Sequence, residues 1–522
     1  MVDAHLWTGG RIFTGHRYVE ALLIDDGTVV AVGPDPDVLR QAPTGSERVN
    51  LHGRLVLPGL IDAHLHLGDL VRMREGLDLS TVHGLDDLLV RLRTWASGHT
   101  GEAVVGRGLD VDRSLGGRWP LREELDRAID DRAVVVYQAS GHAAVANSAA
   151  LEAAGIGSRP AEELPGRVGR SAEGRPNGLV LEEALRGLTP LTATPVGPEE
   201  TVRTLAFLAS LGLTSVASMN ASPDELAGLR AIAAADRLPV RVRAYVRLLR
   251  LSEFAPSNLA PAGRPGRFCV IGAKGFTDGA FGPRTAWLSE PYSDAPEGRG
   301  IPVESDETLS EALARATALG LAPALHAIGD RAVARAARLI APYVGRVGGL
   351  ARIEHVGLVP PAVLSVLEEV RPALVVQPGF VWSDSWLPER LGAERVRWAY
   401  PFRTLANRGL LLVGSSDAPY DPIDPWRGLR AATERCDPEG RSANPAAREA
   451  LAPEEAVRMF TVHGGLAFGE PALGSLEVGS KGDLVVVDAN SVGPAVRAGA
   501  AAVRETWVDG KCVYSAGSSG PV

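Results

Sequence analysis

Apolar and polar positions follow a regular rhythm through the middle of the chain. From about residue 200, short apolar runs are followed by segments whose apolar positions recur every three or four residues, which is typical of helices. The runs of strand length are 213–219, 240–246, 270–277, 322–327, 352–356, 373–377 and 410–415, and helical patterns include 306–319, 332–344 and 361–370. An earlier run at 56–67 adds another strand. Eight strands, mostly separated by helices, predict an α/β fold of the (β/α)8 TIM-barrel type.

Both ends of the chain have a different sequence pattern, which predicts short strands and tight turns. Two apolar runs flank the turn Asp25-Asp26-Gly27, and near the other end Asp509-Gly510 follows the run 503–508. Asp-Gly pairs favour two-residue hairpin turns. Two β-rich ends around a βα middle predict one small β-sandwich built from both termini. The expected domains are residues 1–57 and 467–522 for the sandwich and 58–466 for the barrel.

A long insertion, at about residues 70–195, separates the first predicted barrel strand from the second. It is rich in Arg, Glu and Ala and contains helical patterns at 85–95 and 121–129. The run 133–137 predicts one strong strand. The stretch 164–178 is rich in Gly, Pro and Arg, and we expect it to form a loop.

Composition and charge narrow the class of protein. Among the 522 residues, 45% are hydrophobic and 22% are charged, which is ordinary for a soluble enzyme. The net charge of −9 argues against a nucleic-acid partner. No apolar run predicts a signal peptide or a membrane span, and the three widely spaced cysteines favour a reducing cytoplasm. The expected partner is a small-molecule substrate, and a homodimer is the candidate assembly.

The predicted strand ends carry the side chains that suggest chemistry. His64 and His66 are two residues apart on a strand, so they should face the same way and could bind one metal ion. Catalytic side chains of such barrels lie at the C-terminal ends of the strands. The further polar residues at these ends are Lys274, His326, His355 and Asp417. Glu354 immediately precedes His355 and is therefore expected to face away from the barrel interior.

These features together resemble the amidohydrolase superfamily. The similarity covers the split sandwich, the segment 57–66 that ends in His64-Leu65-His66, and the closing segment 474–486. More narrowly, the chain resembles the family-3 branch that includes N-substituted formamide deformylases. That match rests on the insertion after His66 and on the following residues: Gly141-His142, Asn147, Lys274, Asp278-Gly279, His326, Gly329-Asp330 and Ser416-Asp417-Ala418-Pro419.

The resemblance implies a set of metal ligands. His64, His66 and Asp417 would bind one divalent ion, most simply Zn²⁺, and His326 and His355 would bind a second. Lys274 would be carboxylated and bridge the two ions. Electrostatics favour that modification, because a carbamate, Asp417 and a hydroxide would reduce the charge of two Zn²⁺ ions to about +1. A salt-bridging Lys274 beside a single metal ion is the alternative.

The resemblance also implies a reaction. A metal-activated hydroxide would attack an amide or formamide carbon, and Asp417 would carry the proton to the leaving nitrogen. The alternative within the fold is a mononuclear deaminase of a nitrogenous ring, although such enzymes usually have a Glu close after the fifth-strand histidine, where this chain has Ala-Ile-Gly-Asp. A non-catalytic scaffold with the same fold is a further alternative.

Four residues are weaker candidates for contacts with the substrate. His142 ends a strand of the insertion, and Arg284 follows the strand that carries Lys274. Trp382 and Trp386 follow the seventh strand, where they could line a substrate site at the catalytic face. A buried structural histidine, a solvated arginine and core aromatic residues are the corresponding structural interpretations.

Overall fold

A computed structural model describes residues 4–139, 141–157, 167–192, 196–259, 266–345 and 349–517. The chain divides into two compact units. The first contains residues 1–67, 201–418 and 422–522, and therefore holds both the barrel and the sandwich. The second contains residues 68–200 and 419–421, so the long insertion folds as a unit of its own.

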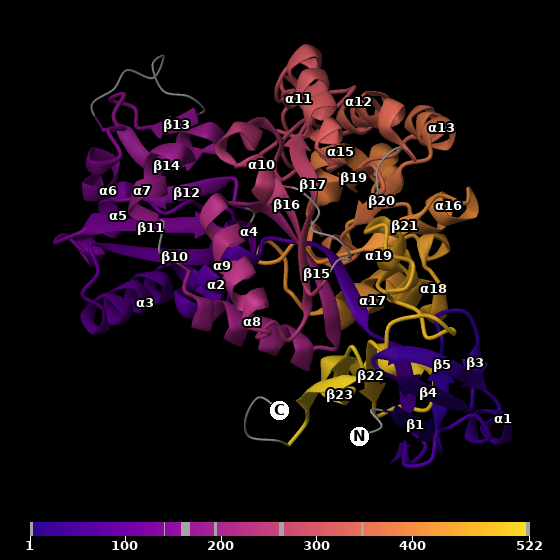
Figure 1. The fold of residues 1–522 in the computed structure, drawn as a ribbon. Coiled ribbons are helices and arrows are strands. Elements are labelled where there is room, and N and C mark those ends of the chain that lie inside the picture. Colours follow the sequence, from indigo (N-terminus) through magenta and orange to yellow (C-terminus); the bar gives the residue numbers. More distant parts are fainter. Residues whose placement is uncertain are drawn as a thin grey trace. The chain divides into compact units, whose positions relative to one another are not determined.

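The barrel of the first unit is a sheet of eight parallel strands (Figure 1). Its order follows the sequence from β8 to β21, so each strand pairs with the next one of the barrel. The strands are β8 (Leu60–Leu65), β15 (Leu213–Ala221), β16 (Arg241–Arg247), β17 (Phe268–Phe276), β18 (Ala322–Ala327), β19 (Arg352–His355), β20 (Ala373–Val376) and β21 (Leu412–Gly414). The predicted barrel is confirmed, because apolar runs bounded by helices pair as parallel neighbours.

The barrel closes between its last strand and its first through bonds at the end of β21. The backbone N–H of Asp417 donates to His64 O at 2.8 Å, and that of His66 donates to Ala418 O at 2.7 Å. The buried Asp62 carboxylate accepts from the N–H groups of His64 and Ser416, both at 3.1 Å. Burial raises the pKa of Asp62 to about 6. These hydrogen bonds thus join the last strand of the sheet to the first beside His64, His66 and Asp417.

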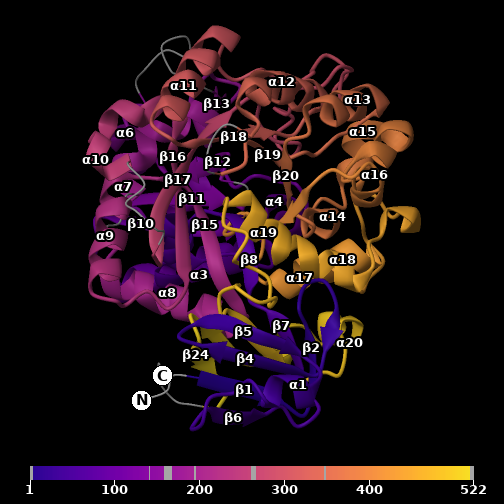
Figure 2. The same ribbon diagram turned by 45° about the vertical axis from the view of Figure 1, so that its right-hand side comes forward.

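Helices cover the outside of the barrel (Figure 2). Apolar positions on one face of each helix pack inward, as the periodicity predicts. The longer ones are α8 (Pro198–Ser210), α9 (Pro223–Ala234), α11 (Asp306–Ala318), α12 (Asp330–Ile340), α13 (Pro361–Val370) and α17 (Pro425–Glu434), with the shorter α16 (Phe402–Asn407), α18 (Pro453–Met459) and α19 (Val462–Ala467). Among the described residues, none of the helices combines the length and apolar character needed to cross a bilayer.

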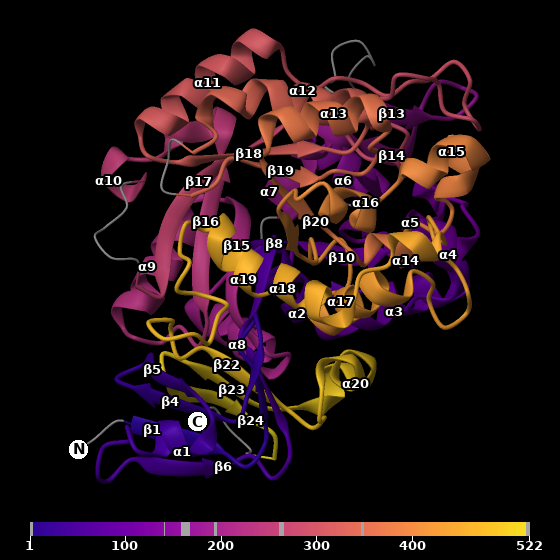
Figure 3. The ribbon, with the colours of Figure 1, turned by 90° about the vertical axis from the view of Figure 1, so that its right-hand side faces the viewer.

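The sandwich combines strands from both termini, as predicted (Figure 3). One sheet has the order β5-β4-β1-β6, and the other has the order β24-β23-β22-β7-β2-β3. Strand β22 pairs antiparallel with β7, so the last part of the chain completes a sheet begun by the first. The strands are β1 (Ala4–Thr8), β2 (Arg11–Phe13), β3 (Tyr18–Val19), β4 (Ala21–Asp25), β5 (Thr28–Gly33), β6 (Glu47–Asn50), β7 (Leu55–Pro58), β22 (Leu484–Val487), β23 (Val503–Val508) and β24 (Lys511–Ser515).

The Asp-Gly turns of the sandwich have the geometry that their sequence favours. Asp26 and Gly27 both have positive φ angles, of 46° and 67°, and connect β4 to β5. Asp509 and Gly510, with φ angles of 53° and 70°, connect β23 to β24. Positive φ at both central residues matches the twist of the flanking strands, which explains why Asp-Gly predicts these hairpins.

The second unit contains a six-stranded mixed sheet with the order β13-β14-β12-β11-β10-β9. Its strands are β9 (Leu77–Asp78), β10 (Ala103–Leu109), β11 (Ala133–Gln138), β12 (Ala143–Ala146), β13 (Arg167–Arg170) and β14 (Pro176–Leu181), and its longer helices are α3 (Gly84–Gly98) and α5 (Arg122–Ala128). The loop predicted for 164–178 is wrong from residue 167 onward, because β13 and β14 form an antiparallel hairpin there. Its glycine-rich middle supplies the turn, and residues 164–166 lie outside the described part.

Candidate metal centre

Six residues proposed as ligands from the sequence come from the C-terminal ends of five barrel strands. His64 and His66 lie at the end of β8 and just after it, Lys274 lies in β17, His326 in β18, His355 at the end of β19, and Asp417 follows β21. The rings of His64 and His66 are 5.5 Å apart between centroids, those of His64 and His355 are 5.0 Å apart, and those of His326 and His355 are 4.5 Å apart. The barrel therefore gathers the four histidines.

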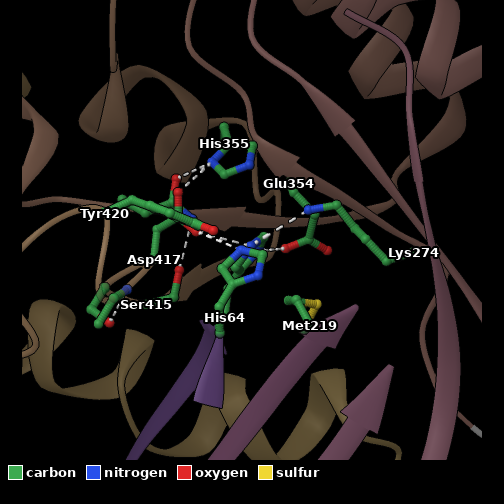
Figure 4. Close-up of polar contacts among 12 residues, drawn as sticks. His64, Met219, Lys274, Glu354, His355, Ser415, Asp417 and Tyr420 are labelled. Atoms are coloured by element: carbon green, nitrogen blue, oxygen red, sulfur yellow. Dashed lines mark hydrogen bonds and ion pairs between the residues drawn. The ribbon is translucent and has the colours of Figure 1, made fainter. Parts of the chain in front are cut away.

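Asp417 lies beside the imidazoles of His64 and His355 (Figure 4). Its Oδ1 is 3.2 Å from His64 Nε2 and 3.3 Å from His66 Nε2, and its Oδ2 is 3.9 Å from His355 Nδ1. Burial alone would raise the pKa of Asp417, but the neighbouring His64, His66 and His355 hold it well below its usual range. Asp417 has a φ angle of 65°, which turns the chain at the end of β21 and places this carboxylate in the barrel mouth.

His64 is supported from behind by Glu354. Its Nδ1 is 2.5 Å from Glu354 Oε2, and both side chains are fully buried. Burial opposes ionisation of Glu354, but Arg352 and His64 outweigh it and lower the pKa of this carboxyl to about 2. An ionised carboxylate only accepts hydrogen bonds, so the proton must lie on His64 Nδ1. With Nδ1 engaged by Glu354, Nε2 is the ring nitrogen left to bind a cation, and it faces Asp417.

The expectation that Glu354 faces away from the interior is wrong. Strict alternation would separate it from His355, but His355 and Val356 have φ angles of 74° and 52°. The backbone thus leaves the extended conformation at the strand end, so alternation no longer fixes which way His355 faces. Both side chains therefore reach the centre, and only the backbone angles reveal it.

His355 is supported by an amide. Its Nδ1 is 2.8 Å from Gln377 Oε1, whose Nε2 donates to Ser415 Oγ at 2.9 Å. Ser415 Oγ in turn donates to the carbonyl of Val376 at 3.0 Å, so it must accept from Gln377. This chain fixes the amide oxygen toward His355 and the proton on Nδ1. Burial, followed by the nearby His326, lowers the pKa of His355 well below its ordinary value, which keeps the ring neutral.

These donors suit a divalent cation. His64, His355 and Asp417 each offer a ligand atom, and the three atoms lie within 4.8 Å of one another. Asp417 Oδ1 is buried and accepts no hydrogen bond in the described part of the chain. A carboxylate oxygen facing an imidazole lone pair is repelled unless positive charge lies between them. A cation would supply that charge, and imidazole nitrogen with carboxylate oxygen is the donor set that Zn²⁺ prefers.

Lys274 and His326 lie beside this trio with other contacts. Lys274 is buried, and its Nζ is 3.5 Å from His64 Nε2. Burial lowers the pKa of Lys274 to about 8, although Glu354 and Asp417 oppose the shift. His326 Nε2 lies 2.9 Å from the carbonyl of Gly279. The same ring nitrogen is 3.5 Å from Asp278 Oδ1.

The weaker candidates are distributed over both units. Arg284 makes a two-point ion pair with Asp294, at 3.2 and 2.7 Å. Trp382 is 8% exposed and has Arg427 and Arg430 over its ring, whereas Trp386 has Arg390 over its ring. His142 belongs to the second unit, where its Nδ1 is 3.0 Å from Glu182 Oε2. Their contact with a substrate stays a prediction.

A family model described as "Amidohydrolase family" matches residues 47–514, which is nearly the whole chain and includes every candidate ligand. The chain belongs to the amidohydrolase family. This membership supports a hydrolase, and it agrees with the resemblance found in the sequence.

Relatives and solved structures extend this assignment. YtcJ of Bacillus subtilis (strain 168), whose name assigns it provisionally to the amidohydrolases, is 30% identical over 98% of this chain and 99% of its own length. N-substituted formamide deformylase of Arthrobacter pascens is 26% identical, with 95% of each chain covered. A crystal structure of an uncharacterized metal-dependent hydrolase from Pyrococcus horikoshii OT3 superposes with a TM-score of 0.79 and 30% identity, over 95% of this chain and 99% of that one.

Proposed function

We propose that the protein is a metal-dependent hydrolase of a non-peptide carbon–nitrogen bond, of the amide or formamide type. The observation that carries the proposal is the buried Asp417 Oδ1, which accepts no hydrogen bond in the described part of the chain and faces His64 Nε2 and His66 Nε2 at 3.2 and 3.3 Å. The names of the deformylase and metal-dependent hydrolase relatives point the same way. A divalent ion held there would acidify water and polarise a carbonyl.

The position of Asp417 supports a role in proton transfer. One of its oxygens faces His64 and His66, and the other faces His355. A carboxylate kept ionised by its neighbours can accept a proton from the attacking water at one oxygen. It can then deliver that proton to the nitrogen of the leaving amine, which would otherwise depart as a poor leaving group. The four imidazoles would bind the cations through neutral ring nitrogens, which leaves Asp417 as the group that moves the proton.

Lys274 would complete a two-ion centre as a carbamate. Its amine nitrogen would attack carbon dioxide, forming an N–C bond and releasing one proton. The product is an anion that could bridge two cations, whereas the ammonium would repel them. The burial of Lys274 and its 3.5 Å approach to His64 Nε2 support this role, because the modified group would enter the space between the imidazoles.

Two partly buried phenyl rings flank the histidines and are relevant to the choice of substrate. Phe276 lies 5.2 Å from the ring of His326, and Phe380 is stacked 6.2 Å from the ring of His355. Most of their strand-end neighbours are buried, but these two rings retain solvent contact. Apolar area exposed beside a polar centre favours a substrate with an apolar substituent near the scissile bond.

An activity screen with Zn²⁺-loaded protein tests the function. N-formyl amines, N-acyl amines and cyclic amides are supplied, and released amine or acid is measured by mass spectrometry. We expect hydrolysis in at least one class, with loss on chelation and recovery on adding Zn²⁺. The exchange Asp488→Asn serves as the matched control, because Asp488 forms an exposed ion pair with Arg504 in the sandwich.

The outcomes separate the candidate functions. No hydrolysis of the three amide classes by metal-loaded protein would contradict the proposal. Release of ammonia from an aminated ring would instead support the deaminase. Protein that purifies without stoichiometric metal and binds none on addition would support the scaffold.

A further inference from the structure

Two imidazoles of the metal centre are supported by acceptors of different charge. Glu354, a carboxylate, faces His64 Nδ1 at 2.5 Å, whereas Gln377, a neutral amide, faces His355 Nδ1 at 2.8 Å. All four side chains are buried. An anionic acceptor behind a ligating imidazole increases its basicity, and a neutral one does so less. The two rings therefore differ as ligands although they are the same residue type.

The carboxylate of Glu354 is itself held in one orientation by Arg352. Arg352 Nε donates to Oε1 at 2.5 Å, and Nη2 donates to Oε2 at 3.2 Å. The same Nη2 donates to the carbonyl of Ala63 at 2.7 Å, next to His64 in the chain. The ring of Tyr245 packs against the guanidinium at 4.3 Å. Because both oxygens are engaged, Glu354 cannot turn away from His64.

We propose that Glu354 is a positioning residue that fixes His64 with its proton on Nδ1 and makes His64 the stronger of the two backed ligands. The cation between His64, His66 and Asp417 is then bound more tightly than one at His355. Arg352 acts one step further out, by holding Glu354. This inference rests on the proposed metal-dependent function, but it concerns cation affinity and needs no knowledge of the substrate.

The most informative variants change the charge of one acceptor at a time, either Glu354 behind His64 or Gln377 behind His355. Glu354→Gln removes the charge behind His64 with little change of shape, but it leaves the Arg352 guanidinium buried without its partner, which could prevent folding. The double variant Arg352→Met with Glu354→Gln removes both charges and avoids that penalty. Gln377→Glu is the matched control, because it adds a carboxylate behind His355 and leaves the support of His64 intact.

The experiment measures binding of Zn²⁺ alone, by competition with a chromophoric chelator. Co²⁺ replaces Zn²⁺ in a second set of samples, and its visible absorption reports the ligand geometry. We expect Glu354→Gln and the double variant to bind the first Zn²⁺ roughly 10–100-fold more weakly than wild type. Their Co²⁺ spectra should change as well. Gln377→Glu should weaken binding of the first Zn²⁺ less than either of these variants, and Asp488→Asn, in the exposed pair with Arg504, should bind it as tightly as wild type.

The results distinguish this inference from the function on which it rests. A folded double variant with wild-type Zn²⁺ affinity and an unchanged Co²⁺ spectrum would overturn the positioning role alone. Equal losses in the double variant and in Gln377→Glu would also overturn it, because they would show a general sensitivity of the centre. A wild type that binds Zn²⁺ tightly yet cleaves no amide would overturn the function and leave the positioning role standing.

Discussion

Buried charges occur at both ends of the barrel, and they are satisfied in different ways. At the N-terminal end of β16, Arg241 donates to both oxygens of Asp483, at 2.9 and 3.1 Å, and also pairs with Asp509. At the C-terminal end, Asp417 Oδ1 has no hydrogen bond within the described residues. The ion pair of Arg241 and Asp483 is complete and joins the sandwich to the barrel. Asp417 Oδ1, in contrast, remains available to bind a ligand.

The difference shows how the same low-dielectric interior serves two purposes. Burial makes an unpaired charge costly, so a charge that only holds domains together is fully paired. At the other end, Asp417 Oδ1 accepts no hydrogen bond within the described residues, and the surrounding backbone holds it in place. We therefore expect exchanges at the two ends to separate activity from stability.

The largest expected effect is on activity at the C-terminal end. Asp417→Asn keeps the shape of the side chain but removes the proton acceptor and an anionic ligand. We expect kcat/KM for the amide identified in the screen to fall by about 10²–10⁴-fold. The thermal midpoint should change little. Wild-type turnover in this variant would show that Asp417 neither carries the proton nor binds the cation.

At the N-terminal end of the barrel, a substitution should lower the stability of the protein. Asp483→Ala removes the carboxylate that makes two bonds to Arg241 and leaves a buried guanidinium with reduced pairing. We expect a loss of about 3–5 kcal/mol in the free energy of unfolding, measured with urea. Asp488→Asn, in the exposed pair with Arg504, is the control and should leave the midpoint unchanged. A loss of stability in Asp417→Asn as large as that in Asp483→Ala would remove the distinction between the ends.

Lys274 tests whether the C-terminal centre holds two cations. Lys274→Ala deletes the proposed bridge, so metal content by mass spectrometry should fall from two ions per chain to one. Added short-chain carboxylates should partly restore the second ion and the activity by occupying the bridging position. Two ions retained by Lys274→Ala would contradict the bridge, and one ion in fully active wild type would favour the mononuclear alternative.

The smallest effect is expected from the phenyl ring beside His355. Phe380→Ala removes apolar area next to the centre without touching the ligand atoms. We expect KM for a substrate with an apolar substituent to rise by about tenfold, consistent with about 1.5 kcal/mol of lost burial, with kcat nearly constant. A substrate with a small polar substituent is the control. Equal changes for both substrates would remove Phe380 from substrate recognition.

The sequence alone determined the frame of the molecule. Apolar runs and helical periodicity located every barrel strand within a few residues, because burial on both faces of a parallel strand requires continuous apolar residues. His64-Leu65-His66 indicated the site for a similarly local reason, namely the two-residue repeat of a strand. The Asp-Gly turns could also be predicted from the sequence, because few residue types adopt the positive φ angles that these turns require.

Only the tertiary structure decided what supports the ligands. Glu354 contacts His64, and His355 also reaches the centre because its backbone adopts positive φ, which no periodicity predicts. Gln377 and Ser415 come from neighbouring strands and meet only when the barrel forms. The hairpin of β13 and β14 was missed for a related reason: its partner β12 lies earlier in the chain, and pairing with it outweighs a local glycine-rich composition. Local patterns are set by neighbours in sequence, whereas these contacts join distant segments and depend on how the whole sheet packs.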